Sequence, residues 1–349
     1  MTRAFVVCPG RGSYNATELG YLRRPGRSTL PEVVAAADAI RAAMNLPTVS
    51  SLDGAPRFDP QTHLRTRHAS PLIFACSVVD AALIDDRFDI VAVAGNSMGW
   101  YTALHVAAAL GFDDAFRLIQ TMSLLQEEHS AGGQLIYPLT DEQWRPDPAA
   151  ADAVERALAE VNAAPEPIAW WSIRLGGYAV LAGSDGGIAG LIERLPVVQR
   201  GGRQYPMVLP GHAAYHTPLL QVTSDRAVET FADLHLKPPR VPLIDGRGHV
   251  FKPLLTDPAE LYRYTFVHQV TRTYDFTHAI RVGLREFAPD CIILLGPGEQ
   301  LGGAIGQVLV ADAWDGIDSR EAFSARQSTA PFLLAMGRAE QFARVSAVA

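Results

Sequence analysis

The feature that most restricts the fold is an uninterrupted apolar run, Ile90–Ala94, that stops at a glycine-flanked turn, Gly95–Gly99, and is followed by an alanine-rich helical stretch, Tyr101–Leu110. Strands that are covered on both faces read as continuous apolar runs, which is typical of a parallel sheet. Two similar runs, Ala4–Cys8 and Cys291–Leu295, also end at glycine and proline. The sequence therefore predicts an α/β fold in which strands of a parallel sheet alternate with helices.

Further apolar patterns extend this alternation along the chain. Apolar residues recur at helical spacing in six segments, and one additional short strand lies between them. The expected helices are 71–84, 113–128, 218–234, 258–267, 276–286 and 332–345, and the expected strand is 241–244. Together with the three apolar runs, these segments predict one large domain with a hydrolase-like α/β architecture.

The middle of the chain has a different texture from about Gly132 onward. The patterns there predict the order strand, helix, strand, strand, helix, and a last strand is available afterwards. The expected segments are 134–139, 149–163, 168–173, 178–182, 186–195 and 203–209. This order is typical of a split β-α-β sandwich. We therefore expect a small ferredoxin-like subdomain, 132–206, inserted into a large domain that comprises 1–131 and 207–349.

Charge and composition limit the classes of partner. The formal net charge is −7, whereas binding to nucleic acid needs a surplus of lysine and arginine. No apolar run approaches the length of about 20 residues that a membrane-spanning helix needs. The first eight residues read as a strand rather than a signal peptide. Cys8, Cys76 and Cys291 lack the spacing of metal ligands, so we expect buried thiols in a reducing cytoplasm and no metal.

The turn around Ser97 has the pattern Gly-x-Ser-x-Gly between a strand and a helix. Flanking glycines allow backbones to pack closely at such a turn, and they leave the serine side chain accessible at the end of the sheet. The N-terminus of the following helix offers free N–H groups and a positive dipole end to an oxyanion. Ser97 is therefore a candidate nucleophile for attack on a carbonyl group. The alternative is a serine that only caps the helix.

Five short motifs, one of which is this turn, are spread over nearly the whole chain. They are Pro9-Gly10-Arg11-Gly12-Ser13-Tyr14, Gly95-Asn96-Ser97-Met98-Gly99-Trp100-Tyr101, Tyr215-His216-Thr217-Pro218-Leu219-Leu220, Gln269-Val270 leading to Thr273-Tyr274-Asp275-Phe276, and Gly296-Pro297-Gly298-Glu299-Gln300-Leu301. In this order they resemble the motifs of the malonyl-CoA:acyl-carrier-protein transacylase family. That family includes the acyltransferase domains of fatty acid and polyketide synthases.

The resemblance implies a role for each matched residue. His216 would be the general base that takes the proton of Ser97, and its other ring nitrogen would donate to the backbone carbonyl of Gln269. The backbone N–H groups of Met98 and Arg11 would form the oxyanion hole. The family has glutamine where Arg11 stands, and because the donor is a backbone atom, this replacement need not remove the hole.

Other histidines offer weaker alternatives. An esterase of the α/β-hydrolase type needs the order serine, acid, histidine. His216 precedes the candidate acid Asp245, so that fold would have to use a later histidine, and no motif marks any of these. The later histidines in question are His249, His268 and His278. His212, four residues before His216, is the nearest competitor for the role of base.

One departure from the family concerns the acyl group. Malonyl-specific members carry an arginine on the helix after the serine, where it pairs with the substrate carboxylate. The matched position is Met122, and no lysine or arginine occurs from Leu118 to Trp144. A buried, unpaired carboxylate is costly. Either the acyl group lacks a carboxylate and packs against Met122, which we favour, or Arg11 binds the carboxylate.

Three more positions are singled out by the resemblance. Tyr215 and Ala213 stand where family members vary with side-chain selectivity, so the expected acyl pocket consists of these two residues, Met122 and Arg11. Trp100 replaces the glutamate that the family usually has after the nucleophile turn, and packing is one interpretation of it.

The expected function is that of a serine acyltransferase with an acyl-Ser97 intermediate. It would move an acyl group, not specifically malonyl, between coenzyme A or an acyl carrier protein and an acyl carrier protein. No permanently bound cofactor is expected, because phosphopantetheine arrives with the substrate. We expect a cytoplasmic monomer without nucleic acid or membrane partners. Because carrier proteins are acidic, candidate docking residues are two arginine pairs, Arg65 with Arg67 and Arg240 with Arg247.

Two rival functions remain open on the same fold. In an acyl-carrier-protein hydrolase, water rather than a thiol would resolve the acyl-enzyme. In a non-catalytic docking subunit, Ser97 would not be acylated at all, although the presence of both Ser97 and His216 argues against this.

Overall fold

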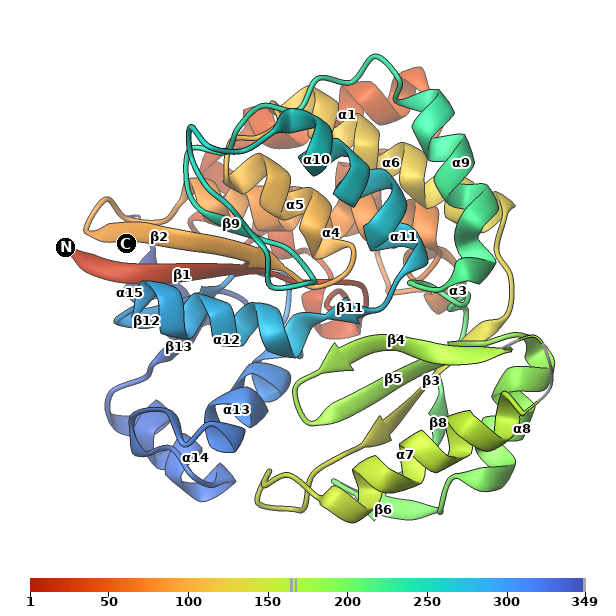
Figure 1. Cartoon of the computed structure of the whole chain (residues 1–349). Helices are drawn as coiled ribbons and strands as arrows, with labels where there is room; N and C mark the ends of the chain where they lie inside the picture. The colour runs from red at the N-terminus through yellow and green to blue at the C-terminus, as the bar shows by residue number, and fades with distance from the viewer. Residues whose placement is uncertain (164–165, 167, 348–349) are drawn as a thin grey trace.

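The computed structural model describes residues 1–163, 166 and 168–347, and its larger domain is built on a six-stranded sheet (Figure 1). The strand order is β10-β9-β2-β1-β12-β13, and β1 runs parallel to both β2 and β12. The edge strand β10 is antiparallel to β9. The strands are β1 Thr2–Cys8, β2 Phe88–Gly95, β9 Leu243–Ile244, β10 Val250–Phe251, β12 Cys291–Leu294 and β13 Leu333–Ala335. The prediction of an α/β fold with a parallel core is confirmed.

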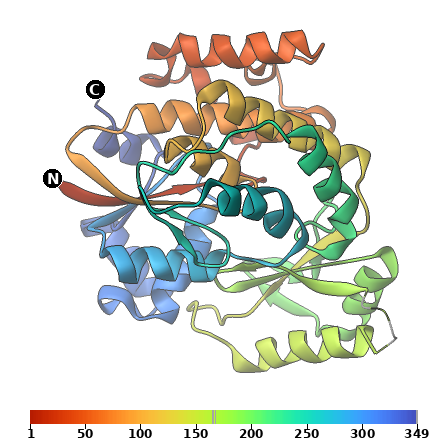
Figure 2. The ribbon, with the colours of Figure 1, turned by 45° about the horizontal axis from the view of Figure 1, so that its top comes forward.

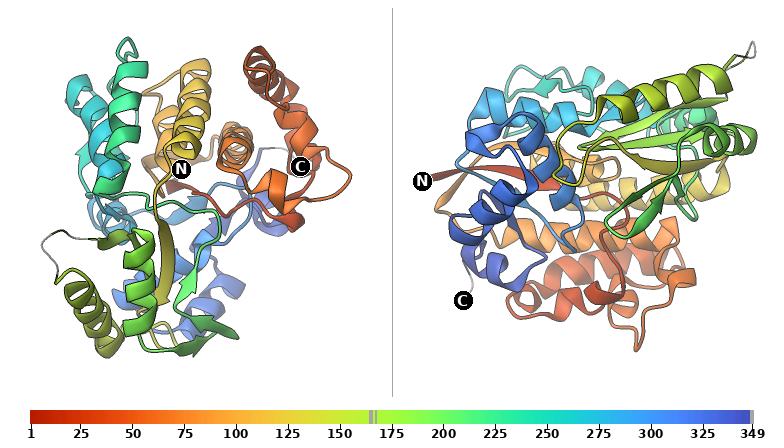
Figure 3. Two further views of the ribbon diagram at one scale, coloured as in Figure 1. Left: turned by 90° about the vertical axis from the view of Figure 1, so that its right-hand side faces the viewer. Right: turned by 90° about the horizontal axis from the view of Figure 1, so that it is seen from below.

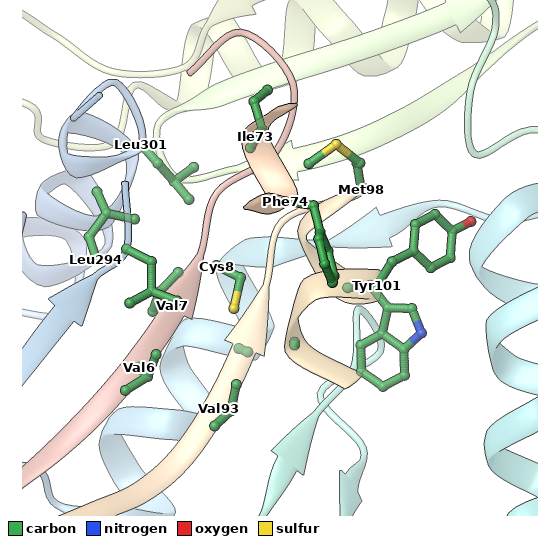
Figure 4. Packing of buried hydrophobic residues seen from close by; sticks show 14 of the residues in the cluster. Val6, Val7, Cys8, Ile73, Phe74, Val93, Met98, Tyr101, Leu294 and Leu301 are labelled. Atoms are coloured by element: carbon green, nitrogen blue, oxygen red, sulfur yellow. The ribbon is translucent and has the colours of Figure 1, made fainter. Parts of the chain in front are cut away.

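Helices cover both faces of this sheet, so its central strands are buried. Helices α4 (Thr66–Ala82), α5 (Gly99–Val106) and α6 (Phe112–Glu128) lie on one side, and α12 (Phe276–Phe287) lies on the other (Figures 1 and 2). Side chains of β1 and β2 meet those of α4 and α5 in the interior (Figure 4). The buried side chains drawn there include Val6, Val7, Ile73, Phe74, Val93 and Tyr101. Burial on both faces explains why the strands read as continuous apolar runs.

A smaller sheet forms the second subdomain, which projects from the larger domain (Figure 3). Its order is β11-β4-β5-β3-β8, and the neighbours among β4, β5, β3 and β8 are antiparallel, as a ferredoxin-like sandwich requires. The strands are β3 Gly133–Pro138, β4 Ala169–Leu175, β5 Tyr178–Gly183 and β8 Met207–Val208, and the helices are α7 Pro148–Val161 and α8 Asp185–Arg194. This sandwich has its own core, to which Leu135, Val154, Leu158, Leu181 and Leu191 belong.

The boundary of the subdomain is less simple than the sequence indicates. The expected strand 203–209 is divided into β7 (Arg203–Tyr205), which pairs with β6 (Val198–Arg200), and β8, which pairs with β3. Pro206 lies between the two parts and has no N–H to continue one ladder. The small sheet also gains β11 (Tyr274–Asp275), which comes from the C-terminal part of the chain and pairs with β4. The small sheet therefore extends beyond 132–206 at both its edges.

The expected C-terminal helix over 332–345 is wrong in its first half. Residues Leu333–Ala335 form β13 beside β12, and the helix α15 begins only at Ala339. A short apolar run can be a buried strand or part of a helix, and periodicity alone does not separate the two. Helices α1 Pro31–Ala43, α2 Val49–Asp53, α3 Pro60–His63, α13 Leu301–Ala311 and α14 Arg320–Thr329 were not anticipated.

The expected helix 258–267 changes type along its length. It begins as α10 (Pro258–Arg263), continues as a π-helix (Tyr264–His268) and ends as α11 (Gln269–Thr271). The expected helix 218–234 begins as a 3₁₀ turn (Pro218–Leu220) and continues as α9 (Gln221–Thr230). In the part of the chain that the structure describes, no helix is both long and apolar enough to cross a membrane.

The end of β1 and the turn after β2 approach each other at backbone distance. The N–H of Asn96 donates to the carbonyl of Cys8 over 3.0 Å. A Cβ atom on Gly99 would lie 2.3 Å from the Cys8 oxygen and 2.7 Å from the Pro9 oxygen. A Cβ atom on Gly95 would lie 2.2 Å from the carbonyl carbon of Gly99. Both glycines are therefore required by the close approach of backbones.

We expect Gly99→Ala to lower the free energy of unfolding by about 3 kcal/mol, because the added methyl group collides with backbone atoms that cannot turn away. Urea denaturation measures the change. Gly303→Ala is the matched control: Gly303 lies in α13 with no heavy atom within 4 Å of its Cβ position. Alanine there should raise the stability by up to about 1 kcal/mol. A Gly99→Ala protein as stable as the parent would contradict this account of the turn.

Candidate active site

Ser97 sits at the tip of the tight turn between β2 and α5. It is one of the residues other than glycine with a positive φ, at 54°. Such a conformation costs free energy, and functional sites are among the places where it recurs. The turn is held by a 2.8 Å hydrogen bond from Gly99 N–H to the Asn96 carbonyl and by a 2.7 Å bond from the Tyr274 hydroxyl to the Gly95 carbonyl. The side chain of Ser97 is thus presented in a fixed direction.

His216 lies directly against Ser97. Its Nε2 is 2.7 Å from the Ser97 Oγ, and its Nδ1 is 2.6 Å from the backbone carbonyl oxygen of Gln269. A carbonyl only accepts hydrogen bonds, so Nδ1 carries the proton and Nε2 is left as an acceptor for the serine hydroxyl. Burial lowers the pKa of His216 to about 4, although the bond to Gln269 opposes the shift. The neutral imidazole therefore has the tautomer of a general base.

The side chain of Gln269 adds a contact that the sequence did not predict. Its Nε2 donates to the Ser97 carbonyl over 3.1 Å, and its Oε1 accepts from the Tyr101 hydroxyl over 3.1 Å. Gln269 is buried and follows directly on the π-helix, a helix type frequent at functional sites. One residue therefore orients the histidine through its backbone and the serine turn through its side chain.

The two N–H groups expected to form the oxyanion hole are available. Among the described residues, neither Met98 N–H nor Arg11 N–H donates to a protein acceptor. Arg11 follows the end of β1 and Met98 follows Ser97, and both line the same cavity as Ser97 and His216. Free backbone donors beside a serine that is paired with a neutral histidine are the arrangement that stabilises a tetrahedral oxyanion.

The guanidinium group of Arg11 faces this cavity and contacts neutral acceptors. Its Nη1 donates to the Tyr215 hydroxyl over 2.6 Å and to Thr66 Oγ1 over 2.9 Å, and its Nη2 donates to the Gly211 carbonyl over 3.3 Å. Within the described ranges no carboxylate pairs with it. Arg11 thus joins the large domain to the connection from the small one and leaves its charge uncompensated.

The cavity beside Ser97 is narrow, with a volume of about 20 Å³, little more than one water molecule occupies. Of the four residues expected in an acyl pocket, Arg11 and Tyr215 line it. Met122 is buried in α6 and Ala213 is buried nearby, but neither lines the cavity. Its other walls come from Met98, Tyr101, Gln126, Leu220, Gln269 and Val270.

Gln126 could have been found from the sequence. It lies four residues after Met122 on α6, which places the two side chains on one face of the helix. Met122 stands at the position matched to the family, whereas the residue that reaches the cavity lies one helical turn later. Trp100 is fully buried, and its indole N–H donates to Thr265 Oγ1 over 3.0 Å, so its role is packing.

The rival histidines are placed elsewhere. His212 contacts Gln134 Oε1 through Nδ1 over 2.8 Å, and burial together with nearby Arg11 lowers its pKa to about 3. Asp245 pairs with Arg247 over 2.6 Å rather than with a histidine that faces Ser97. His249, His268 and His278 do not line the cavity. The order serine, acid, histidine of an α/β-hydrolase therefore has no counterpart in this site.

The arginine pairs expected at a docking face are partly neutralised. Arg65 and Arg67 both form ion pairs with Glu127. Arg247 is paired with Asp245, and Arg240 is exposed. The three cysteines are free and buried, and the described residues contain no cluster of side chains suited to a metal ion.

Comparisons with known proteins agree with the sequence motifs, although no protein-family model matches the chain. The chain is 27% identical over 244 residues to polyketide synthase GfsB of Streptomyces halstedii, a match that covers 68% of this chain and 4% of that protein. It is 23% identical over 239 residues to a malonyl CoA-acyl carrier protein transacylase of Synechocystis, covering 68% of this chain and 73% of the relative.

Solved structures give the same picture of the fold. The malonyl-CoA:acyl carrier protein transacylase of Xanthomonas oryzae superimposes with a TM-score of 0.74 at 19% identity, covering 98% of this chain and 96% of that one. A malonyl-transacylase in complex with its type II polyketide synthase carrier protein gives 0.75 at 17% identity, with 98% of both chains covered. The resemblance to malonyl-CoA:acyl carrier protein transacylases and polyketide synthase acyltransferases is confirmed, as is the fold.

The lowered pKa of His216 predicts an unusual pH dependence. A base is active only above its pKa, so the rate at which a serine-directed phosphonofluoridate modifies Ser97 should stay level through pH 6.5 and fall only towards about pH 4. His216→Gln should reduce the rate about 100-fold or more at every pH well above 4, and the difference should shrink where His216 is protonated.

Circular dichroism at each pH is the control for unfolding. Between pH 6.5 and about 4 the unfolded chain binds more protons at this histidine than the folded one does, so stability also falls as the pH falls. A rate midpoint near 6.5 in fully folded protein would show that His216 is solvated, contrary to its position here.

Proposed function

We propose that the chain is a serine acyltransferase that forms an acyl-Ser97 intermediate and passes the acyl group to a thiol. The observation that carries this proposal is the short chain of contacts from Ser97 through His216 to the carbonyl of Gln269. It makes a nucleophile and a base of the correct tautomer without an acidic residue. We propose that the enzyme acts in the cytoplasm as a monomer.

In the first half-reaction, the Ser97 hydroxyl oxygen attacks the carbonyl carbon of a thioester while His216 Nε2 takes its proton. Negative charge develops on the carbonyl oxygen and is met by the N–H groups of Met98 and Arg11. The carbon–sulfur bond then breaks, and the imidazolium returns the proton to the departing sulfur. An oxygen ester on Ser97 and a free thiol result.

The second half-reaction runs the same steps in reverse with a different thiol. His216 takes the proton of the incoming thiol, whose sulfur attacks the ester carbonyl, and Ser97 leaves with the proton restored. The Synechocystis and Xanthomonas oryzae proteins are named as transacylases between malonyl-CoA and acyl carrier protein. We propose the same carriers here, with the phosphopantetheine supplied by the substrate and no cofactor held by the protein.

We also propose that the acyl group is not specifically malonyl. The helix position that would supply an arginine is Met122, which is apolar and buried among other apolar side chains. A carboxylate placed there would lose its water without gaining a partner. Arg11 is the cation that lines the cavity, and it is held by Thr66 and Tyr215.

Incubation of the protein with acyl-CoA and carrier-bound acyl thioesters should add one acyl mass to the intact chain. Ser97→Ala should abolish the adduct, and Ser324→Ala, which changes an exposed serine of α14, should leave it unchanged. Mass spectrometry of the intact protein and of its peptides locates the group. If no thioester modifies Ser97, the protein is a non-catalytic docking subunit.

The fate of the adduct separates a transferase from a hydrolase. Acyl-Ser97 should persist in buffer and disappear when a pantetheine thiol or a reduced carrier protein is added. The transfer product is followed by mass spectrometry of the acceptor. Rapid release of free acid without any thiol would instead identify an acyl-carrier-protein hydrolase.

Loading with a series of acyl-CoAs tests the acyl preference. We expect short uncharged acyl groups to load Ser97 faster than malonyl, by about tenfold or more, because an uncompensated buried charge costs at least about 1.4 kcal/mol. Initial rates of adduct formation measure the ratio. If malonyl loads fastest, the inference from Met122 is wrong. Arg11→Ala should then lose loading by malonyl while it retains loading by acetyl.

A further inference from the structure

A second hollow lies beside the helical segment that carries Gln269. It is bounded by α10, the π-helix, α11 and the turn after β9, and its volume is about 310 Å³, at the lower end of the range for small-molecule pockets. We name it the arginine groove and define it by Arg247, Glu260, Arg263, Tyr264, His268 and Arg272.

The arginine groove and the catalytic cavity share two segments of chain. Gln269 and Val270 line the cavity, whereas His268 and Thr271, the residues on either side, line the groove. In the same way Leu220 lines the cavity and the next residue lines the groove. The two hollows therefore lie on different sides of one helical segment, and a helix with its side chains is roughly 10–12 Å across.

Positive charge exceeds negative charge in this groove. Arg247 is neutralised by Asp245 at 2.6 Å and stacks over the Tyr264 ring at 4.7 Å from its centroid. The exposed side chains of Arg263 and Arg272 make no hydrogen bond or ion pair with any residue that the structure describes. Glu260 also lines the groove, so Arg247, Arg263 and Arg272 stand against two carboxylates, and the groove has an excess of one positive charge in a chain whose net charge is −7.

His268, on the wall of the groove, responds to this excess. Burial lowers the pKa of its imidazole, and Arg247 and Arg272 lower it further, whereas Asp245 opposes the shift. A proton is thus disfavoured on this partly buried ring, first by burial and then by the two arginines. The electrostatic potential in the groove favours an anion.

We propose that the arginine groove binds the phosphate groups at the nucleotide end of coenzyme A while the pantetheine arm reaches Ser97. This inference rests on the proposed function, because it requires an acyl-CoA as donor. Arg263 and Arg272 supply the paired N–H donors that suit phosphate oxygens. The pantetheine arm is a long flexible chain that can pass around one helix.

The shape of the groove favours a nucleotide over a carrier protein. A concave hollow of about 310 Å³ encloses a small ligand, whereas a helix of a carrier protein is a rod roughly 10–12 Å across and would rest on the rim. The partly exposed Val267 and the buried ring of Tyr264 add apolar wall next to the guanidinium groups, as small-molecule sites require.

The double variant Arg263→Gln/Arg272→Gln tests the groove with two acyl donors that differ only in whether they carry the nucleotide. Acyl-CoA carries the nucleotide, and the matching acyl-pantetheine does not. We expect the KM for acyl-CoA to rise at least about tenfold with kcat unchanged, because two charge-assisted hydrogen bonds are lost. The KM for acyl-pantetheine should not change. The salt dependence of loading by acyl-CoA should also become weaker.

Arg156→Gln is the matched control, because Arg156 is an exposed arginine on α7, outside both hollows. If the double variant raised the KM for acyl-CoA and for acyl-pantetheine equally, the proposal would be overturned. The groove would then affect the acyl-transfer reaction itself and not the binding of the nucleotide. Unchanged loading by acyl-CoA, with slower transfer to a carrier protein, would also overturn it and would assign the groove to the carrier.

Calorimetry separates this inference from the proposed function. Adenosine 3′,5′-bisphosphate should bind the Ser97→Ala protein and lose at least about tenfold in affinity when Arg263→Gln/Arg272→Gln is added. This measurement needs no acyl transfer, so it decides the groove even if Ser97 accepts no acyl group. Equal affinity in both proteins would overturn the proposal.

Discussion

The site depends on one backbone contact, the packing of the turn Gly95–Gly99 against the end of β1. Because Asn96 N–H donates to the Cys8 carbonyl, the ends of two neighbouring parallel strands are held together. The residues that follow those strands, Ser97 on one and Arg11 on the other, then line the same cavity. The positions of the candidate nucleophile and of both candidate oxyanion donors therefore follow from a strand pairing, and glycine is needed where the backbones touch.

Gln269 links the turn at Ser97 to the candidate base, His216. Its carbonyl fixes the proton of His216 on Nδ1, and its amide holds the carbonyl of Ser97. Tyr274, which follows shortly afterwards, donates to Gly95 and enters the small sheet as part of β11. The segment after the π-helix therefore joins the histidine, the serine turn and the second subdomain, so a shift of one subdomain against the other would disturb the dyad.

Local pattern was enough to predict much of this arrangement, and it failed where long-range contacts decide. Ile90–Ala94 and Gly95–Gly99 could be interpreted because continuous apolar strands and glycine turns carry their own signal. The structure of residues 332–345 could not be predicted in this way. The apolar run there forms a strand because it pairs with β12, which is distant in sequence. The amide of Gln269 was missed because it acts on Ser97, a residue distant in sequence.

The distribution of charge explains where substrate selection can reside. Arg27 is buried but paired with Asp80 at 2.7 Å, and Arg67 is paired with Glu127, so neither has charge to offer a ligand. Among the described residues that line the two hollows, Arg11, Arg263 and Arg272 have no carboxylate partner. Arg11 lines the cavity beside Ser97, whereas the other two line the arginine groove. Under the proposed function, Met122 offers no charge, so selection for the acyl group would depend on the shape of the cavity and on Arg11, and selection for its carrier would depend on a surface that is separate from the chemistry.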